Sequence, residues 1–459
     1  MKKFEKGFLV GAATAAHQVE GNNVNSDCWA MEHMEHTSFV EPSLDAVDHY
    51  NRYEEDIRLM KEAGLNAYRF SIEWARIQPE ENRFAEEEIE HYRKVIRCCK
   101  ENGLEPVVTL HHFSSPRWLI GKGGWEAETV PEDFARYVRY VCERLGEEFH
   151  YVCTINEANM GVQVAAVAKR YMMQMMAKMK QAQAGAAASG GFGQASAASA
   201  ENGEAASAQP GGGASADGSV QMGINLEKMM AGQQEAAEEN RKVFGVAKVE
   251  NFTSPRTERG DQLVMEAHRA ARAVIRELCP RAKVGLTLSL HDLQAQPGGE
   301  ENAVREWEEE FLHYLPAIAG DDFLGVQNYT RTRIDASGQM PNPEGAELTQ
   351  MEYEFYPQAL EHVIRRVAEK FQGVLMVTEN GVAVSDDARR VEFIRRATEG
   401  VQNCIADGIP VKGYFYWSLM DNFEWQKGYG MTFGLIAVER TSQKRVPKPS
   451  LRVLGEYCG

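Results

Sequence analysis

Eight short β-rich segments recur along the chain with helical segments between most of them, and this alternation constrains the fold more than any other feature. The β-rich segments lie at 8–13, 66–72, 106–110, 151–155, 283–290, 323–329, 374–378 and 412–418. Apolar residues at helical spacing predict helices at 48–62, 86–100, 131–148, 261–278 and 356–370. Strand–helix alternation repeated eight times is typical of a closed parallel barrel. An open doubly wound sheet would more often carry a glycine-rich phosphate turn after its first strand, and residues 11–14 do not form one. We therefore predict an α/β protein, a (β/α)8 TIM barrel that forms a single domain over residues 1–459.

One stretch of low complexity interrupts this pattern. Residues 181–223 consist largely of Ala, Gly, Ser and Gln, which cannot bury enough apolar surface to offset the entropy of ordering, so we predict a disordered insertion there. The segment just before it, 171–179, is rich in methionine. A methionine-rich helix usually belongs to an adaptable core, which is the first interpretation. The alternative is a soft wall beside a substrate entrance.

Charge and cysteine usage exclude several functional classes. The chain has 67 acidic and 50 basic residues, a formal net charge of -17, which repels nucleic acids and anionic membranes. Its eight cysteines show neither a CxxC pair nor a zinc or disulfide spacing, so free and mostly buried thiols are expected, with no metal and no cofactor. With neither an apolar signal segment nor a run of membrane-spanning length, we expect a cytoplasmic protein. A homo-oligomer is compatible with this composition.

Two glutamates end β-rich runs that lie far apart in the sequence. They occur in Thr154-Ile155-Asn156-Glu157 and in Thr378-Glu379-Asn380-Gly381. A carboxylate at the C-terminal end of a barrel strand lies where such barrels carry their chemistry. A retaining glycosidase needs two such carboxyl groups about 5–5.5 Å apart. The alternative is that each glutamate only caps a loop or forms an ion pair.

These two motifs resemble those of glycoside hydrolase family 1, the β-glucosidase family of retaining (β/α)8 enzymes. In that family a T-x-N-E-P motif supplies the acid/base and an E-N-G motif supplies the nucleophile. The resemblance therefore implies that Glu157 is the acid/base and Glu379 the nucleophile. Ala158 stands where the family has proline.

The resemblance also implies a set of substrate-binding residues spread along the chain. They are Gln18, His112, Asn156, Tyr329, Trp417, Glu424 and Trp425. Arg69 and Tyr329 are implied as the partners that keep the nucleophile ionised, although Arg69 could instead form a simple ion pair at the barrel mouth. Asn156 corresponds to the residue that binds the sugar 2-hydroxyl, and Glu424 suits the 4- and 6-hydroxyls. The tryptophans offer faces on which a pyranose ring stacks.

Some positions depart from the family pattern. Gln327 stands where an asparagine is usual, and Phe113 where tryptophan is frequent. His111, next to His112 on the same strand, should point away from the site because strand side chains alternate. Glu20 falls in the same motif as Gln18. The stretch that usually shapes the aglycone site is replaced by the methionine-rich and low-complexity residues.

The leading hypothesis is a retaining exo-β-glycosidase that hydrolyses terminal non-reducing β-D-glucosyl residues, with tolerance for galactosyl or fucosyl groups. Its partner is a small β-glycoside or oligosaccharide, with no nucleic acid and no membrane. One alternative is a 6-phospho-β-glucosidase, but Glu424 should repel a phosphate, and Lys427 and Tyr429 do not fit the phosphate-binding spacing. The other is a catalytically silent sugar-binding barrel, against which the intact Glu157 and Glu379 argue.

Overall fold

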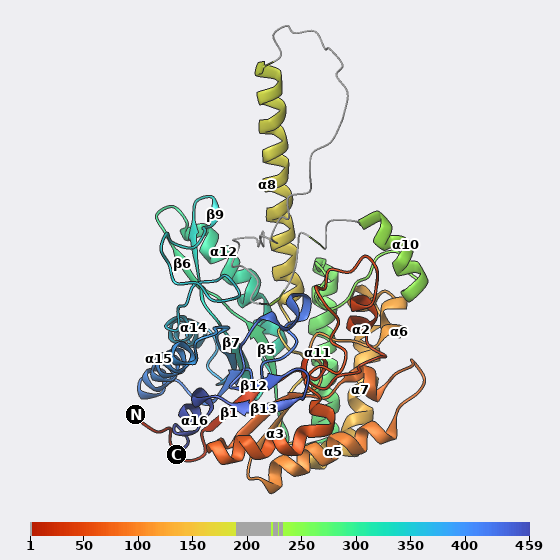
Figure 1. The fold of residues 1–459 in the computed structure, drawn as a ribbon, viewed down its shortest axis with the longest axis vertical. Coiled ribbons are helices and arrows are strands. Elements are labelled where there is room, and N and C mark those ends of the chain that lie inside the picture. The colour runs from red at the N-terminus through yellow and green to blue at the C-terminus, as the bar shows by residue number, and fades with distance from the viewer. Residues whose placement is uncertain (1, 190–221, 224–227, 229–232) are drawn as a thin grey trace.

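A closed barrel of eight parallel strands forms the centre of the molecule (Figure 1). The computed structural model describes residues 2–189, 222–223, 228 and 233–459. The strands follow the order β1-β11-β10-β7-β5-β4-β3-β2 around the barrel. They are β1 (Leu9–Ala13), β2 (Ala67–Ser71), β3 (Glu105–Thr109), β4 (Tyr151–Cys153), β5 (Lys283–Ser289), β7 (Phe323–Gln327), β10 (Val374–Asn380) and β11 (Val411–Trp417). Each coincides with one of the eight predicted segments, so the predicted TIM barrel is confirmed.

Helices cover the outside of the barrel and include all five that the sequence predicted. The longer ones are α3 (His49–Ala63), α5 (Glu86–Glu101), α7 (Val130–Leu145), α11 (Glu258–Leu278), α12 (Glu300–Glu310), α14 (Ala359–Ala368), α15 (Asp387–Ala406) and α16 (Pro449–Gly455). Shorter ones are α1 (Ala16–Val19), α2 (Asp27–Glu32), α4 (Trp74–Ile77), α6 (Arg117–Gly121) and α13 (Leu315–Ile318). α10 (Gln233–Phe244) lies at the rim of the barrel (Figure 1). The amphipathic helices turn their apolar faces to the strands, as their spacing predicts.

Two small sheets lie outside the barrel. β6 (Asp292–Ala295), β8 (Arg331–Asp335) and β9 (Gly338–Gln339) form one, and β12 (Ile436–Glu439) pairs with β13 (Lys444–Pro447) in the other. Within the barrel, a Cβ atom at Gly325 would lie only 2.6 Å from Thr287 Cγ2. Glycine at this position of β7 therefore leaves room for the threonine side chain of the neighbouring strand β5.

Helix α8 (Met160–Ser189) rises from the rim and projects away from the barrel (Figure 1). Its first turns are buried, with Met160 fully enclosed, whereas Met172, Met173, Met175 and Met176 are 43–57% exposed. The adaptable-core interpretation is therefore wrong for these four residues. The helix also continues through residues 181–189, which the sequence had assigned to the disordered insertion. The remainder of that prediction, at 190–221, lies outside the described residues.

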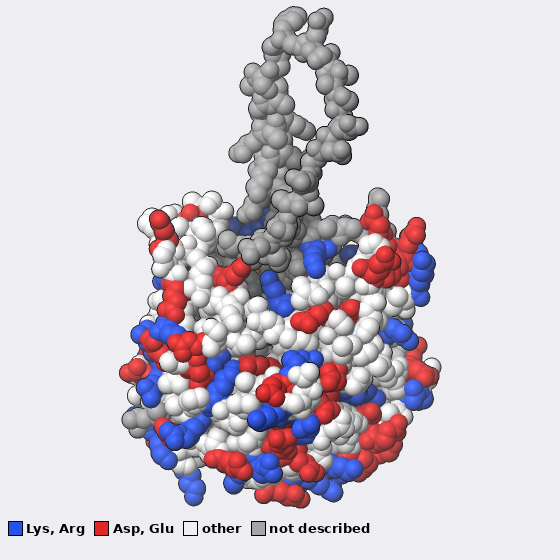
Figure 2. Space-filling view, viewed as in Figure 1, with Lys and Arg blue, Asp and Glu red and all other residues white. Residues whose placement is uncertain are grey.

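The surface and the cysteines agree with the composition. Figure 2 shows acidic and basic side chains interspersed over the face in view. All eight cysteines are free, six of them buried, as predicted. Among the helices that the structure describes, none combines the length and the apolar character that crossing a membrane requires.

Candidate active site

One small cavity at the carboxyl end of the barrel contains most of the residues singled out from the sequence. Its lining residues are His112, Phe113, Glu157, Met222, Tyr329, Glu379, Trp417, Glu424, Trp425 and Phe433. Glu157 follows β4 and Glu379 lies in β10, so barrel closure brings the two carboxyl groups to the same cavity. Both side chains are buried. The pairing that the sequence suggested is therefore present in the fold.

Arg69 and Tyr329 both donate hydrogen bonds to the carboxylate of Glu379. Arg69 Nη1 donates to Oε1 at 2.6 Å, and the Tyr329 hydroxyl donates to Oε2 at 2.6 Å. Burial raises the pKa of Glu379, while the Arg69 charge and the Tyr329 hydrogen bond both oppose that rise. Arg69 Nη2 also donates to Asn156 Oδ1 at 2.5 Å, so the guanidinium bridges two site residues and is more than an isolated ion pair.

The surroundings of Glu157 differ from those of Glu379. Its backbone adopts the left-handed region at φ 44°, which is unusual for a residue other than glycine and is common where function requires strain. Its N–H donates to Thr287 Oγ1 at 2.9 Å, which fixes the start of the loop against strand β5. Burial and the charge of Glu379 raise the pKa of Glu157 well above its ordinary value. A proton shared by the two carboxyls therefore resides on Glu157.

Asn156 lies at the centre of a hydrogen-bond network that reaches Glu379 through Arg69. Its Oδ1 accepts from Gln327 Nε2 at 2.8 Å as well as from Arg69, and its Nδ2 donates to His112 Nε2 at 3.2 Å. Burial lowers the pKa of His112 well below its usual value, so the ring is neutral and can accept this hydrogen bond. Gln327, the residue that departs from the family pattern, thus holds Asn156 in place.

Glu424 lines the cavity, and Gln18 binds it from behind. Gln18 Nε2 donates to Phe423 O at 2.7 Å and to Glu424 Oε2 at 3.3 Å. Its Oε1 is buried without a hydrogen-bond partner among the described residues, so it is available to a ligand hydroxyl. Burial, reinforced by the charge of Glu379, raises the pKa of Glu424 to about 8. Glu424 is therefore mostly protonated at pH 7, which corrects the expectation that its charge repels a phosphate.

Aromatic rings form the remaining walls. Trp417 stacks with His112 at a centroid distance of 5.5 Å, and Trp425 stacks with His17 at 5.7 Å. Trp425 and Phe113 both have positive φ angles, of 46° and 66°. Three strained residues, with Glu157, therefore surround this cavity, as is common at functional sites.

Two residues of the sequence motifs lie elsewhere. Glu20 accepts hydrogen bonds from Arg76 Nε at 2.7 Å and from the Tyr92 hydroxyl, so it stabilises the fold behind the site. His111 points away from the cavity and pairs with Ser115 Oγ at 3.0 Å, as the strand alternation predicted.

Several contacts of the site were not predicted from the sequence. Thr287 binds the Glu157 amide, and its main-chain oxygen accepts from Ala158 N at 3.0 Å, a donor that proline would lack. Alternating Thr287 and Ser289 on an otherwise apolar strand was the only available signal for this face of β5. No sequence pattern indicated that Met222, in the low-complexity segment, lines the site.

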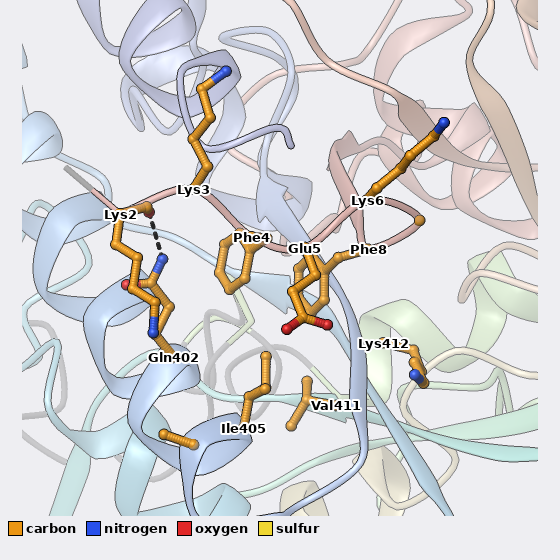
Figure 3. Close-up of a pocket in the computed structure, with 12 residues that line it drawn as sticks. Lys2, Lys3, Phe4, Glu5, Lys6, Phe8, Gln402, Ile405, Val411 and Lys412 are labelled. Atoms are coloured by element: carbon orange, nitrogen blue, oxygen red, sulfur yellow. Dashed lines mark hydrogen bonds between the residues drawn. The ribbon is translucent and has the colours of Figure 1, made fainter.

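A larger cavity of about 300 Å³ lies at the opposite, amino-terminal end of the barrel (Figure 3). It is lined by residues 2–8 together with Gln402, Ile405, Val411 and Lys412. In Figure 3 the Glu5 carboxylate and the ring of Phe4 face this space. Conserved chemistry in such barrels lies at the other end, and no residue singled out from the sequence lines this cavity. Within the described ranges, no cluster of His, Cys, Asp or Glu is arranged to hold a metal ion.

Comparison with known proteins identifies what this chain is similar to. The sequence profile of Glycosyl hydrolase family 1 matches residues 1–238 and 310–457. A 1,4-β-D-glucan glucohydrolase of Thermotoga neapolitana is 29% identical, covering 98% of this chain and 97% of the relative. A 6-phospho-β-galactosidase of Lacticaseibacillus casei is 26% identical, covering 98% and 96%. The crystal structure of β-glycosidase BGL167 superposes with a TM-score of 0.80 at 42% identity, covering 99% of this chain and 96% of that one.

Proposed function

Because the chain belongs to glycosyl hydrolase family 1 and is an O-glycosyl hydrolase of β-glycosides, we propose that it removes terminal non-reducing β-D-glucosyl residues with retention of configuration. The observation that carries the proposal is the unequal environment of two buried carboxyl groups. Glu379 receives hydrogen bonds from Arg69 and Tyr329, whereas the pKa of Glu157 is raised well above its ordinary value. One carboxyl group suits a nucleophile and the other a proton donor.

In the first step, Glu379 attacks the anomeric carbon while Glu157 donates its proton to the departing glycosidic oxygen. The bond to the aglycone breaks as the glycosyl ester on Glu379 forms. Arg69 then loses its charged partner, and Glu157 loses the negative charge that raised its pKa. Its pKa falls, which prepares Glu157 for the second step.

In the second step, Glu157 accepts a proton from water, and the resulting hydroxide equivalent attacks the anomeric carbon. The ester bond breaks, Glu379 leaves as a carboxylate, and the sugar departs in the β configuration. Two inversions at one carbon give net retention. Asn156, which Arg69 and Gln327 hold in place, is suited to bind the 2-hydroxyl during both steps.

Preference for a chain end follows from the cavity walls. Glu424 and Trp425 line the cavity as buried side chains, and Gln18, also buried, hydrogen-bonds to Glu424, so these residues suit the closed end of a pocket that accepts a terminal sugar. The unpartnered Gln18 Oε1 and the protonated Glu424 offer an acceptor and a donor for the outer hydroxyls of glucose. A fucosyl or galactosyl group differs only at these outer positions, so tolerance for them belongs to the proposal.

The residues that line the cavity favour an unphosphorylated sugar as substrate. No lysine or arginine is among the described residues that line it. The Tyr429 hydroxyl, which does not fit the phosphate-binding spacing, donates to Ser43 O at 2.5 Å. A phosphate would therefore lack a cationic partner.

The test combines product stereochemistry with a substrate pair. Proton NMR of 4-nitrophenyl β-D-glucoside hydrolysis should show β-glucose first, before it mutarotates. The 6-phosphorylated glucoside should be hydrolysed at least tenfold more slowly. First appearance of α-glucose would refute retention, faster hydrolysis of the phosphorylated substrate would favour a 6-phospho-β-glucosidase, and loss of all hydrolysis would favour the silent barrel.

A further inference from the structure

Met222, from the low-complexity segment, lines the cavity that the proposed function assigns to the sugar, and its neighbour Gly223 contacts Glu424, which also lines it. Met222 is only 7% exposed and lines the cavity together with the two carboxyl groups and both tryptophans. Gly223 O accepts a hydrogen bond from Gln426 N at 3.1 Å, and the Gly223 N–H donates to the Glu424 carboxyl. The dipeptide thus contacts the site through an apolar side chain and through its main chain.

With this dipeptide in place, the cavity is too small for a sugar. Its volume is about 20 Å³, room for a single water molecule. Sites that bind small ligands usually measure about 300–1,000 Å³. A pyranose ring therefore cannot lie beside Glu157 and Glu379 while Met222 remains where it is.

The contacts that the dipeptide makes resemble those of a sugar. The Gly223 N–H donates a hydrogen bond to the Glu424 carboxyl, the group suited to bind the outer hydroxyls of a sugar. The Met222 side chain lines the same cavity as Trp417 and Trp425, whose faces suit a pyranose, and a thioether packs well on aromatic rings.

Only glycine fits at position 223. A Cβ atom there would lie 2.7 Å from the main-chain oxygen of Glu424 and 3.2 Å from Lys427 Cγ. The first contact is with backbone, so it cannot be relieved by a side-chain rotation. Any larger residue at 223 would push the dipeptide out of the cavity.

We propose that Met222 and Gly223 act as an internal competitor of the sugar: they occupy the glycone subsite, and substrate binds only after they leave it. Since a protein binds ligand with an affinity reduced by the fraction of molecules in the competent state, the dipeptide weakens apparent affinity without altering the catalytic groups. The inference rests on the proposed function, because it takes this cavity to be the sugar site.

The first test measures binding of an iminosugar of gluco configuration, 1-deoxynojirimycin, by isothermal titration calorimetry. Met222→Ala and Gly223→Ala should each lower Kd by on the order of tenfold, because each weakens the occupied state. Met175→Ala, on the exposed part of α8, is the matched control and should leave Kd unchanged. Equal or weaker binding by both cavity variants would overturn the proposal. No binding by any protein, wild type included, would instead refute the proposed function.

The second test uses the unaltered chain and does not depend on activity. Hydrogen peroxide oxidises exposed methionines, and peptide mass spectrometry reports the rate at each residue. Met222 should oxidise more slowly than Met175 in the free protein, and saturating 1-deoxynojirimycin should accelerate oxidation of Met222 alone. If the iminosugar binds but protects Met222 or leaves its rate unchanged, the methionine is a fixed wall of the sugar site and the competitor proposal is wrong.

Discussion

At the scale of single residues, the account depends on the different surroundings of Glu157 and Glu379. Glu157→Ala should retain the first step on substrates with good leaving groups, such as dinitrophenyl glucosides, because these need little protonation. The second step should stall for lack of a base, giving a burst of dinitrophenol followed by slow turnover. Azide should restore turnover and yield the β-glucosyl azide. Equal losses on activated and unactivated glucosides, with no burst, would exclude the acid/base role.

A substitution of Tyr329 tests whether Glu379 acts as the ionised nucleophile. Its hydroxyl donates to Glu379 and holds the pKa of that carboxyl down, so Tyr329→Phe should raise that pKa. Because the nucleophile must be ionised, the acidic limb of kcat/KM should move to higher pH, and activity should fall roughly ten- to a hundredfold, as for loss of a charge-assisted hydrogen bond of about 1.5–3 kcal/mol. The control is Tyr414→Phe, which loses a buried bond to Asn380 but touches neither carboxyl. An acidic limb that moves equally in both variants would contradict the assignment.

Glu424 tests recognition of the sugar. Glu424→Ser should lower kcat/KM for a glucoside by roughly ten- to a hundredfold, because two hydrogen bonds to the outer hydroxyls, of about 0.5–1.5 kcal/mol each, are lost. The loss should be smaller for the 6-deoxy sugar, which lacks one of the two hydroxyls. Equal losses on both substrates would mean that Glu424 supports the surrounding loop and does not bind the sugar.

The sequence motifs identified the carboxyl groups of the site, but the protonation states of these groups could not be predicted from sequence. The motifs identified Glu157, Glu379 and Glu424, yet the pKa of Glu424 depends on burial and on Glu379, 45 positions away in sequence. The interactions of Gln327 with Asn156 likewise depend on two strands meeting across the barrel.

At the scale of elements, helix α8 provides a direct test of burial. Met172→Gln and Met176→Gln, on its exposed part, should each change the free energy of unfolding by less than about 0.5 kcal/mol. Met160→Ala, in the buried first turn of the same helix, should cost about 2–5 kcal/mol. Urea denaturation of the three variants measures the difference. A large loss for the two exposed positions would show that they pack against the rest of the protein.

Strands and amphipathic helices were predictable because their periodicity reflects the face that they bury, as in α7 and α11. The exposure of the methionine-rich part of α8 could not be predicted, because its apolar residues are distributed around the whole helix and define no single apolar face. Composition alone could not distinguish a core helix from one that projects from the rim. Nor could it predict that Met222 lines the cavity and that Gly223 contacts Glu424, since neither residue belongs to a periodic pattern.

At the scale of the whole molecule, closure of the barrel creates the site. It joins Gln18 from the first strand region to Glu424 from the last, and Arg69 to Glu379 across 310 positions of sequence. The alternation of strands and helices predicted this closure, but the distances within the site come only from the packed barrel. The central claim is that Glu379 forms a covalent bond to the sugar in that setting.

Trapping the glycosyl-enzyme tests this claim most directly. 2,4-Dinitrophenyl 2-deoxy-2-fluoro-β-D-glucoside has a good leaving group but a slowed second step, so the ester should accumulate. Peptide mass spectrometry after proteolysis should show one fluoroglucosyl group, carried by Glu379. A label on Glu157 or on any other residue, or release of dinitrophenol with no label at all, would contradict the account.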